Sequence, residues 1–196
     1  MSAPRRVIVG ISGASGVIYG IRLLEILQGS GIETHLIMTR AAEITLAHET
    51  NRKLAEVHGL ADHVHSATDI AAAVSSGSFR TLGMIVAPCS VRSMAEIASG
   101  VTSGLLSRAA DVVLKERRRL VLMVRETPLH SGHLRNMAAL SEMGAIIAPP
   151  VPAFYARPKT LEDMIDHTLG RVLDLFGIET DGLVKRWKEE HVSGCD

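Results

Sequence analysis

Aromatic residues are scarce in this sequence: Phe, Trp and Tyr make up 3% of its 196 residues. A core must therefore be built from Ala, Val, Leu, Ile and Met, which suits helices packed on a β-sheet. The sequence also lacks net charge, with 21 basic and 21 acidic side chains. It has neither the broad basic surface of a nucleic-acid binder nor a polybasic run for an anionic membrane. A small molecule is the expected partner.

Long apolar runs are also absent. No stretch approaches the roughly 20 residues needed to span a bilayer, and residues 1–6 do not begin a signal peptide. We therefore expect a cytoplasmic protein. The only two cysteines, Cys89 and Cys195, make a poor case for a disulfide in a reducing compartment. Cys89 follows Pro88 and is either a nucleophile or, more commonly for such a residue, a buried thiol.

Short apolar runs rich in β-branched residues alternate with segments of helical period. This alternation predicts one α/β domain over residues 1–196, Rossmann-like or flavodoxin-like, with a parallel sheet covered by helices on both faces. The expected strands are Arg6–Ile11, Thr34–Met38, Gly83–Ala87, Leu120–Val124 and Ala145–Ala148. The expected helices are Gly16–Gln28, Ala41–His48, Asp69–Ser75, Met94–Ala98, Leu105–Arg118, His133–Met143 and Leu161–Phe176.

Residues that follow these strands should meet at one edge of the sheet, where ligands of such folds bind. The segment 13–16, Gly-Ala-Ser-Gly, allows close backbone approach at a helix N-terminus, which favours a phosphate. It matches neither the dinucleotide pattern G-x-G-x-x-G nor a P-loop with its Lys. A tight turn with Ser15 as helix cap is an equally good interpretation. Ser90 and Ser93 flank Arg92 at a second helix start that suits an anion.

Three further features carry charge or rigidity. Arg125 and Glu126 directly follow an apolar strand, where they indicate either a polar site or a structural ion pair. Residues 149–158 are rich in proline and predict a rigid lid or an arm that reaches a neighbouring subunit. The stretch 183–196 predicts a C-terminal helix and tail.

Three motifs suggest a metal or a polyanion, but each has a simpler explanation. The acids Glu162, Asp163 and Asp166 open an amphipathic helix, where negative charge is favourable. His130 and His133 have no nearby third ligand in the sequence and suit a loop and helix start. The basic run 115–119 closes a helix at its negative end. We therefore expect no metal in the chemistry.

The sequence resembles the UbiX/Pad-type flavin prenyltransferases over nearly its whole length. The resemblance is carried by GISGASG at 10–16, Glu49, PCSVRS at 88–93, RAADVVLKE at 108–116, VRETPL at 124–129 and PPVPAFY at 149–155. It implies transfer of a dimethylallyl group from dimethylallyl monophosphate to N5 and C6 of reduced FMN. The prenylated FMN would serve a partner UbiD-type decarboxylase, and the enzyme would be a homo-oligomer, a dodecamer by resemblance.

The resemblance also implies a role for each matching position. FMN would be bound by Gly13, Ala14, Ser15, Thr39, Ser90, Val91, Arg92, Ser93 and Arg125. Dimethylallyl monophosphate would be held by Lys115, Arg125, Glu126, Tyr155 and Arg171, partly across a subunit boundary. The catalytic set would be Ser15, Glu49, Lys115 and Glu126. Relatives usually carry Ser-Lys where this chain has Thr39-Arg40, so the hydroxyl and the charge are kept.

Two alternatives belong to other functional classes. An FMN-dependent peptidyl-Cys decarboxylase would share the architecture but needs a His base near the flavin. A non-catalytic flavin-carrying subunit of an aromatic-acid decarboxylase would not need a second phosphate site. The cationic residues at 115, 125 and 171 favour the prenyltransferase over both.

Overall fold

The computed structural model describes residues 5–180 and 182–186. The chain divides into two compact units, residues 1–149 and residues 150–196. The first unit contains the sheet, and the second contains the proline-rich segment and the last helix. Among the described helices, none is both long enough and apolar enough to cross a membrane.

The sheet of the first unit has six parallel strands in the order β3-β2-β1-β4-β5-β6. This is the strand order of the Rossmann fold, and it places the change of winding direction between β1 and β4. The strands are β1 (Arg6–Ile11), β2 (Glu33–Met38), β3 (His63–His65), β4 (Gly83–Cys89), β5 (Arg119–Val124) and β6 (Ile146–Ile147).

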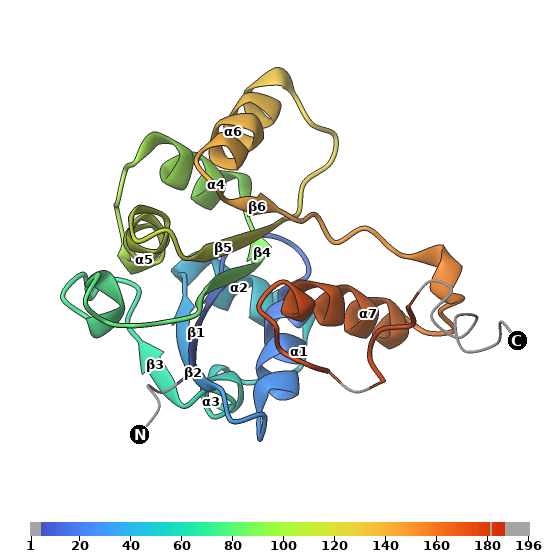
Figure 1. Ribbon diagram of the computed structural model, residues 1–196. Helices are drawn as coiled ribbons and strands as arrows, with labels where there is room; N and C mark the ends of the chain where they lie inside the picture. The colour runs from blue at the N-terminus through green and yellow to red at the C-terminus, as the bar shows by residue number, and fades with distance from the viewer. Residues whose placement is uncertain (1–4, 181, 187–196) are drawn as a thin grey trace, which may run out of the picture. The chain divides into compact units, whose positions relative to one another are not determined.

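Helices cover both faces of this sheet (Figure 1). The helices of the first unit are α1 (Val17–Leu27), α2 (Arg40–Glu49), α3 (Leu54–His58), α4 (Val91–Ser99), α5 (Leu105–Lys115) and α6 (Ser131–Glu142). Residues of α4, α5 and α6 share one buried cluster with Ile8, Ile37 and Val86 of the sheet. Helix α1 packs on the opposite face against β1 and β4. Aliphatic side chains and methionines form this core, as the scarcity of aromatics predicts.

The sequence-based prediction of a parallel α/β sheet is confirmed, and most element bounds agree within a few residues. Two short elements were not predicted: α3 and the edge strand β3, in which polar His63 and His65 hide the strand pattern. The helix predicted over Asp69–Ser75 is wrong, because only a single 3₁₀ turn, Ala73–Ser75, forms there. Asp69 instead accepts a hydrogen bond from the backbone of Ala71, which makes a turn competitive with a helix.

The second unit contains a 3₁₀ turn, Phe154–Ala156, and helix α7 (Leu161–Asp174). The Thr160 hydroxyl caps α7 by accepting a hydrogen bond from the N–H of Asp163, and the N–H of Thr160 donates to the Asp163 carboxylate in return. The acidic motif at 162–166 therefore serves a helix start. The helix predicted from residue 183 is wrong over residues 183–186, which form a turn and an irregular segment. Trp187 and the rest of the predicted tail lie outside the described residues.

Candidate active site

The ends of β1 and β4 are joined by Ser12, a fully buried side chain. Its Oγ donates a hydrogen bond to the carbonyl of Pro88 at 2.9 Å and accepts one from the N–H of Ser90 at 2.7 Å. These two strands flank the point at which the sheet changes winding direction, where ligands of Rossmann folds bind. Ser12 therefore fixes the backbone on both sides of the crevice.

Replacing Ser12 by Ala is expected to destabilise the protein. The variant would leave the half-buried N–H of Ser90 without its acceptor, which costs about 1–3 kcal/mol of unfolding free energy. Urea denaturation of the two proteins measures this difference. The matched control is Ser99→Ala, since the Ser99 hydroxyl is exposed and bonds only carbonyls of its own helix. Equal midpoints for the Ser12 variant and the parent would contradict this role.

A pocket of about 210 Å³ opens beside this junction at the carboxyl ends of β1, β2 and β4. Five of the residues expected to bind a cofactor line it: Gly13, Thr39, Ser90, Arg92 and Ser93. Ala14 and Val91 were also expected to bind the cofactor. Ala14 follows the lining residue Gly13 in the chain, and Val91 lies between the lining residues Ser90 and Arg92. Arg40, whose charge the resemblance also indicated, lies in the wall as well. The wall is completed by residues that the sequence did not single out: Ala41, Ala67, Glu96, Ser103, Gly104, Leu106 and Ser107.

Three helices begin at this pocket. Thr39 caps α2 and accepts a bond from the N–H of Ala42, and Ser90 caps α4 and accepts one from the N–H of Ser93. Helix α5 begins after Gly104, which has no side chain to cap it. Helix N-termini carry partial positive charge and free N–H groups, so three of them around one pocket suit an anion such as a phosphate.

The charges in the pocket are arranged in pairs. Arg40 contacts Glu43 at 2.7 Å, and Arg92 contacts Glu96 at 3.1 Å. Glu96 also accepts a hydrogen bond from the Ser103 hydroxyl at 2.8 Å. Both arginine side chains are more than four-fifths exposed, so they lie at the mouth of the pocket.

Gly13 brings the turn after β1 into contact with α2. A Cβ atom at this position would lie 2.3 Å from the Cβ of Ala41. Any larger residue would therefore push the turn away from the start of α2. The lack of a side chain keeps the pocket wall thin enough for a flat or phosphorylated ligand to approach the backbone.

Glu49 and Ser15 meet next to this pocket, at the start of α1. The Glu49 carboxylate accepts hydrogen bonds from the N–H groups of Gly16 at 2.8 Å and Val17 at 3.0 Å. Partial burial raises the pKa of Glu49, but hydrogen bonds from the Ser15 side chain and these two N–H groups, with the charge of Arg125, outweigh it. The pKa of Glu49 consequently lies below its usual range, and the side chain is an anion at neutral pH.

Arg125 lies near this carboxylate although it follows a different strand, β5. Its charge acts on both Glu49 and Tyr19, and its N–H donates to the carbonyl of Cys89. Partial burial raises the pKa of Tyr19, an effect that Arg125 opposes. Tyr19, in the first turn of α1, was not identified from the sequence. Ser15, Tyr19, Glu49 and Arg125 thus form a polar cluster at the same edge as the pocket.

Glu126 follows Arg125 at this edge and is exposed. Its carboxylate accepts a hydrogen bond from the N–H of Thr127 at 3.0 Å. Lys115 is not brought to the pocket within one chain. It ends α5, eight residues after the pocket residue Ser107 or about 12 Å along the helix axis, and contacts Glu116 at 2.6 Å.

The second unit contains the remaining two predicted residues. The Tyr155 hydroxyl lies 3.3 Å from Nε2 of His167, and the two rings meet edge to face. Arg171 contacts Asp174 at 2.7 Å, and Arg186 binds the same carboxylate. Tyr155 and Arg171 are both exposed.

Cys89 is a buried thiol and not a nucleophile. It is fully inaccessible, and burial raises the pKa of its thiol to about 12. We expect a thiol reagent at pH 8 to leave the native Cys195→Ser variant unlabelled and to label one thiol after unfolding in urea. Rapid labelling of that variant in its native state would contradict this assignment.

A larger pocket of about 520 Å³ lies at the opposite edge of the sheet, between the end of α1 and the end of α3. Its lining includes two carboxylates, Glu33 and Asp62, and no Lys or Arg. It has no capped helix start and is therefore poorly suited to a phosphate. The smaller pocket at the carboxyl ends of the strands is the better candidate despite its size.

Comparison with known proteins agrees with this geometry. The Flavoprotein family model matches residues 1–173. The flavin prenyltransferase UbiX of Escherichia coli K12 is 59% identical over 94% of this chain and 98% of its own. The crystal structure of AnUbiX in complex with FMN and dimethylallyl pyrophosphate has a TM-score of 0.92 at 52% identity, covering 94% of this chain and 98% of that chain.

A dodecameric FMN-dependent UbiX-like decarboxylase from Escherichia coli O157:H7 is also similar. It has a TM-score of 0.90 at 50% identity and covers 93% of this chain and 98% of its own. Each of these two solved structures covers more than nine-tenths of this chain, so the similarity includes residues of both compact units.

Proposed function

The chain belongs to the UbiX flavin prenyltransferases of the Flavoprotein family, and from that premise we propose how its own residues carry out the transfer. The protein is a transferase that uses FMN and joins a dimethylallyl group to it. The observation that supports the site assignment is that the turn after β1 joins two features: Gly13 lines the anion pocket, and Ser15, two residues on, bonds Glu49 beside Arg125.

The flavin phosphate is assigned to the pocket at the starts of α2, α4 and α5. Thr39, Ser90 and Ser93 supply hydroxyls there, while Val91 and Arg92 supply N–H groups of the first turn of α4. Gly13 and Ala14 allow the ligand to lie against the backbone. From this pocket the flavin ring is directed along the strand ends toward Ser15 and Arg125.

The transfer forms two bonds to reduced FMN, one at N5 as phosphate leaves and one at C6 that closes a new ring. The second bond adds a proton to the alkene and removes one from C6, so it needs a proton donor and an acceptor. Glu49 is ionised and hydrogen-bonded to Ser15, which suits this pair to proton movement at the ring. Glu126 is assigned to proton exchange with the departing phosphate.

The leaving phosphate needs positive charge, which Lys115, Arg125 and Arg171 supply together with the Tyr155 hydroxyl. Lys115 lies at the far end of α5 in its own chain, so we assign it to the site of a neighbouring subunit. A homo-oligomer, and specifically a dodecamer like the Escherichia coli O157:H7 relative, provides such neighbours. These cations replace the magnesium that a diphosphate would require.

We test the leaving group by supplying reduced FMN with dimethylallyl monophosphate or dimethylallyl diphosphate, each with and without magnesium. The proposal expects transfer from the monophosphate that is independent of magnesium. Transfer from the diphosphate alone, or only when magnesium is present, would contradict the cation assignment without removing the transferase activity.

The alternatives of a peptidyl-Cys decarboxylase and a non-catalytic flavin carrier are not needed. We propose that the product passes to a UbiD-type decarboxylase and that both proteins reside in the cytoplasm. The product should activate a decarboxylase prepared without cofactor, and cell fractionation should recover the protein with cytoplasmic enzymes. Failure of the first experiment would contradict the proposed recipient, and failure of the second would contradict the proposed location; neither would contradict prenyl transfer.

A further inference from the structure

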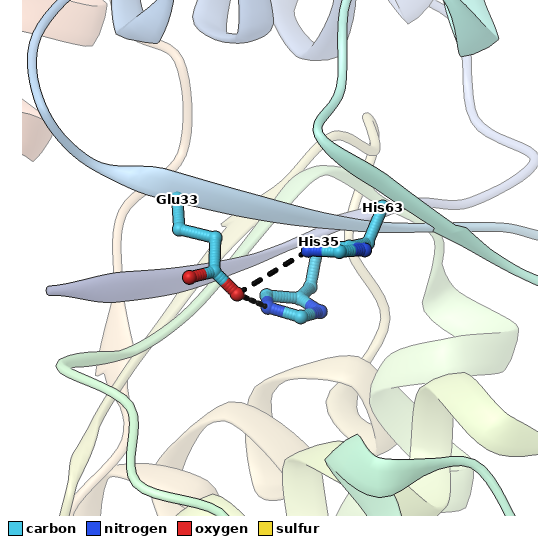
Figure 2. A group of neighbouring side chains, drawn as sticks. All are labelled: Glu33, His35 and His63. Atoms are coloured by element: carbon cyan, nitrogen blue, oxygen red, sulfur yellow. Dashed lines mark hydrogen bonds and ion pairs between the residues drawn. The ribbon is translucent and has the colours of Figure 1, made fainter. Parts of the chain in front are cut away.

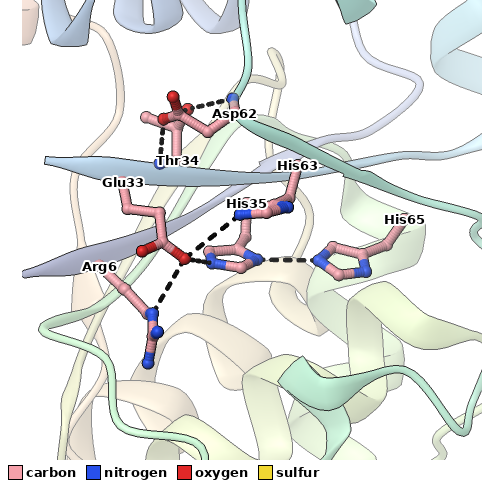
Figure 3. A network of polar contacts seen from close by, with 7 residues as sticks. All are labelled: Arg6, Glu33, Thr34, His35, Asp62, His63 and His65. Atoms are coloured by element: carbon pink, nitrogen blue, oxygen red, sulfur yellow. Dashed lines mark hydrogen bonds and ion pairs between the residues drawn. The ribbon is translucent and has the colours of Figure 1, made fainter. Parts of the chain in front are cut away.

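Three histidines and a glutamate gather on β2 and the edge strand β3 (Figure 3). Glu33 and His35 belong to β2, and His63 and His65 belong to β3. His35 is paired with His63 in the parallel register. Side chains two residues apart on a strand share a face, so all four project from the same face of the sheet.

The carboxylate and two of the rings converge on one point (Figure 2). Glu33 Oε1 lies 2.9 Å from Nε2 of His35 and 3.4 Å from Nε2 of His63. One ligand atom from each residue lies within 4.8 Å of the other two. Tetrahedral zinc with bonds of roughly 2.0–2.1 Å separates its ligand atoms by about 3.3 Å. The Glu33–His63 distance is close to that value, whereas the Glu33–His35 distance is that of a hydrogen bond, which a bound ion would replace.

Neighbouring side chains fix the orientation of the His35 ring. His35 is only 4% exposed, and its Nδ1 lies 2.9 Å from Nε2 of His65. The His35 ring is stacked on the rings of both His63 and His65. A hydrogen bond to the second nitrogen is the usual way to orient a metal-binding histidine.

We propose that Glu33, His35 and His63 form a binding site for one divalent transition-metal ion of the zinc class, with His65 as the residue that orients His35. Two imidazoles and one carboxylate suit zinc and its neighbours better than magnesium or calcium, which prefer oxygen ligands. His63 is 53% exposed, so solvent can fill the fourth position.

One nearby cation opposes the metal. Arg6 Nε contacts the same carboxylate oxygen, Glu33 Oε1, at 3.0 Å, and its guanidinium lies over the ring of Phe79. A bound ion would compete with Arg6 for that oxygen. The site is therefore expected to bind more tightly when the charge of Arg6 is removed.

The position of the site indicates a structural role. Glu33 and His63 begin their strands, so they lie at the amino edge of the sheet, opposite the anion pocket. Strand β3 has three residues and pairs with β2 alone, and a metal bridge would fasten this edge strand. The ion would raise stability without taking part in prenyl transfer.

The test titrates Zn²⁺ into the full-length oligomer after treatment with a chelator, using calorimetry and a competing colorimetric chelator. We expect one Zn²⁺ per chain. Loss of a hydrogen-bond partner of a metal-bound histidine costs roughly 10- to 100-fold in affinity, which is our expectation for His65→Ala. His63→Ala and Glu33→Gln should lose more than this, whereas Arg6→Gln should gain affinity.

The matched control is His58→Ala, which removes a histidine of α3 outside the cluster and should leave the affinity unchanged. Zn²⁺ should raise the melting temperature of the parent and not that of His63→Ala, a surface variant that should fold normally. Prenyl transfer should be equal with and without the chelator. Affinity unchanged in both His63→Ala and Glu33→Gln would overturn the proposal and leave the cluster as a hydrogen-bonded network.

Discussion

Glu49→Gln is expected to produce flavin that carries the five-carbon group through a single bond, because ring closure fails. The amide can still accept the hydrogen bonds that Gly16 and Val17 donate to Glu49, so the start of α1 should stay capped. It has no charge with which to move a proton, and loss of general acid–base catalysis typically costs about 10²–10⁴ in rate. The singly bonded and ring-closed products are isomers, so mass cannot distinguish them. Proton NMR of the released flavin can, because ring closure removes the C6 proton.

The control for this experiment is Glu142→Gln, an exposed acid at the end of α6 that lies outside the site. It should give the ring-closed flavin at the parent rate. Ring closure at the parent rate by Glu49→Gln would remove Glu49 from the mechanism and leave it as a helix cap.

Lys115→Ala is expected to bind FMN normally but to lose transfer by about 10²–10³-fold, the usual cost of removing a group that stabilises transition-state charge. Within one chain Lys115 lies about 12 Å along α5 from Ser107 of the pocket. Its effect on the reaction should therefore appear in the site of a neighbouring subunit.

Coexpression tests this subunit exchange. The partner variant is Gly13→Val, whose side chain would collide with Ala41 and close the flavin pocket. Each variant alone should be inactive. Hybrid oligomers should recover activity, since random pairing places an intact pocket beside an intact Lys115 in about one site in four. Lys53→Ala, which removes an exposed lysine directly before α3, is the single-variant control. No recovery in verified hybrids would show that Lys115 acts within its own chain or not at all.

The sheet was predictable because its central strands are apolar on both faces. β1, β4 and β5 read as short aliphatic runs, and their buried residues are those of the core. The edge strand β3 was missed because its sequence, His-Val-His, is mostly polar and only half covered. The cluster of histidines and Glu33 was missed for the same reason, since its members come together only through the register of β2 and β3.

The pocket was partly predictable for a related reason. Thr39 and Ser90 each follow a strand and precede a helix, a pattern that marks a capped helix start. The start of α5 at Leu105 was predicted, but its place in the pocket was not, because Gly104 caps it without a side chain and a backbone bond from Leu105 to Ala67 holds it there. Arg125 and Glu49 are far apart in the sequence, so the sequence could not show that the charge of Arg125 would lower the pKa of Glu49.

The most direct test of the central claim is anaerobic incubation of the protein with reduced FMN and dimethylallyl monophosphate in the presence of a chelator. Mass analysis of the released flavin should show the gain of one five-carbon unit, with no gain when oxidised FMN is supplied. Unmodified flavin after incubation with reduced FMN, under conditions in which the protein binds it, would contradict the account.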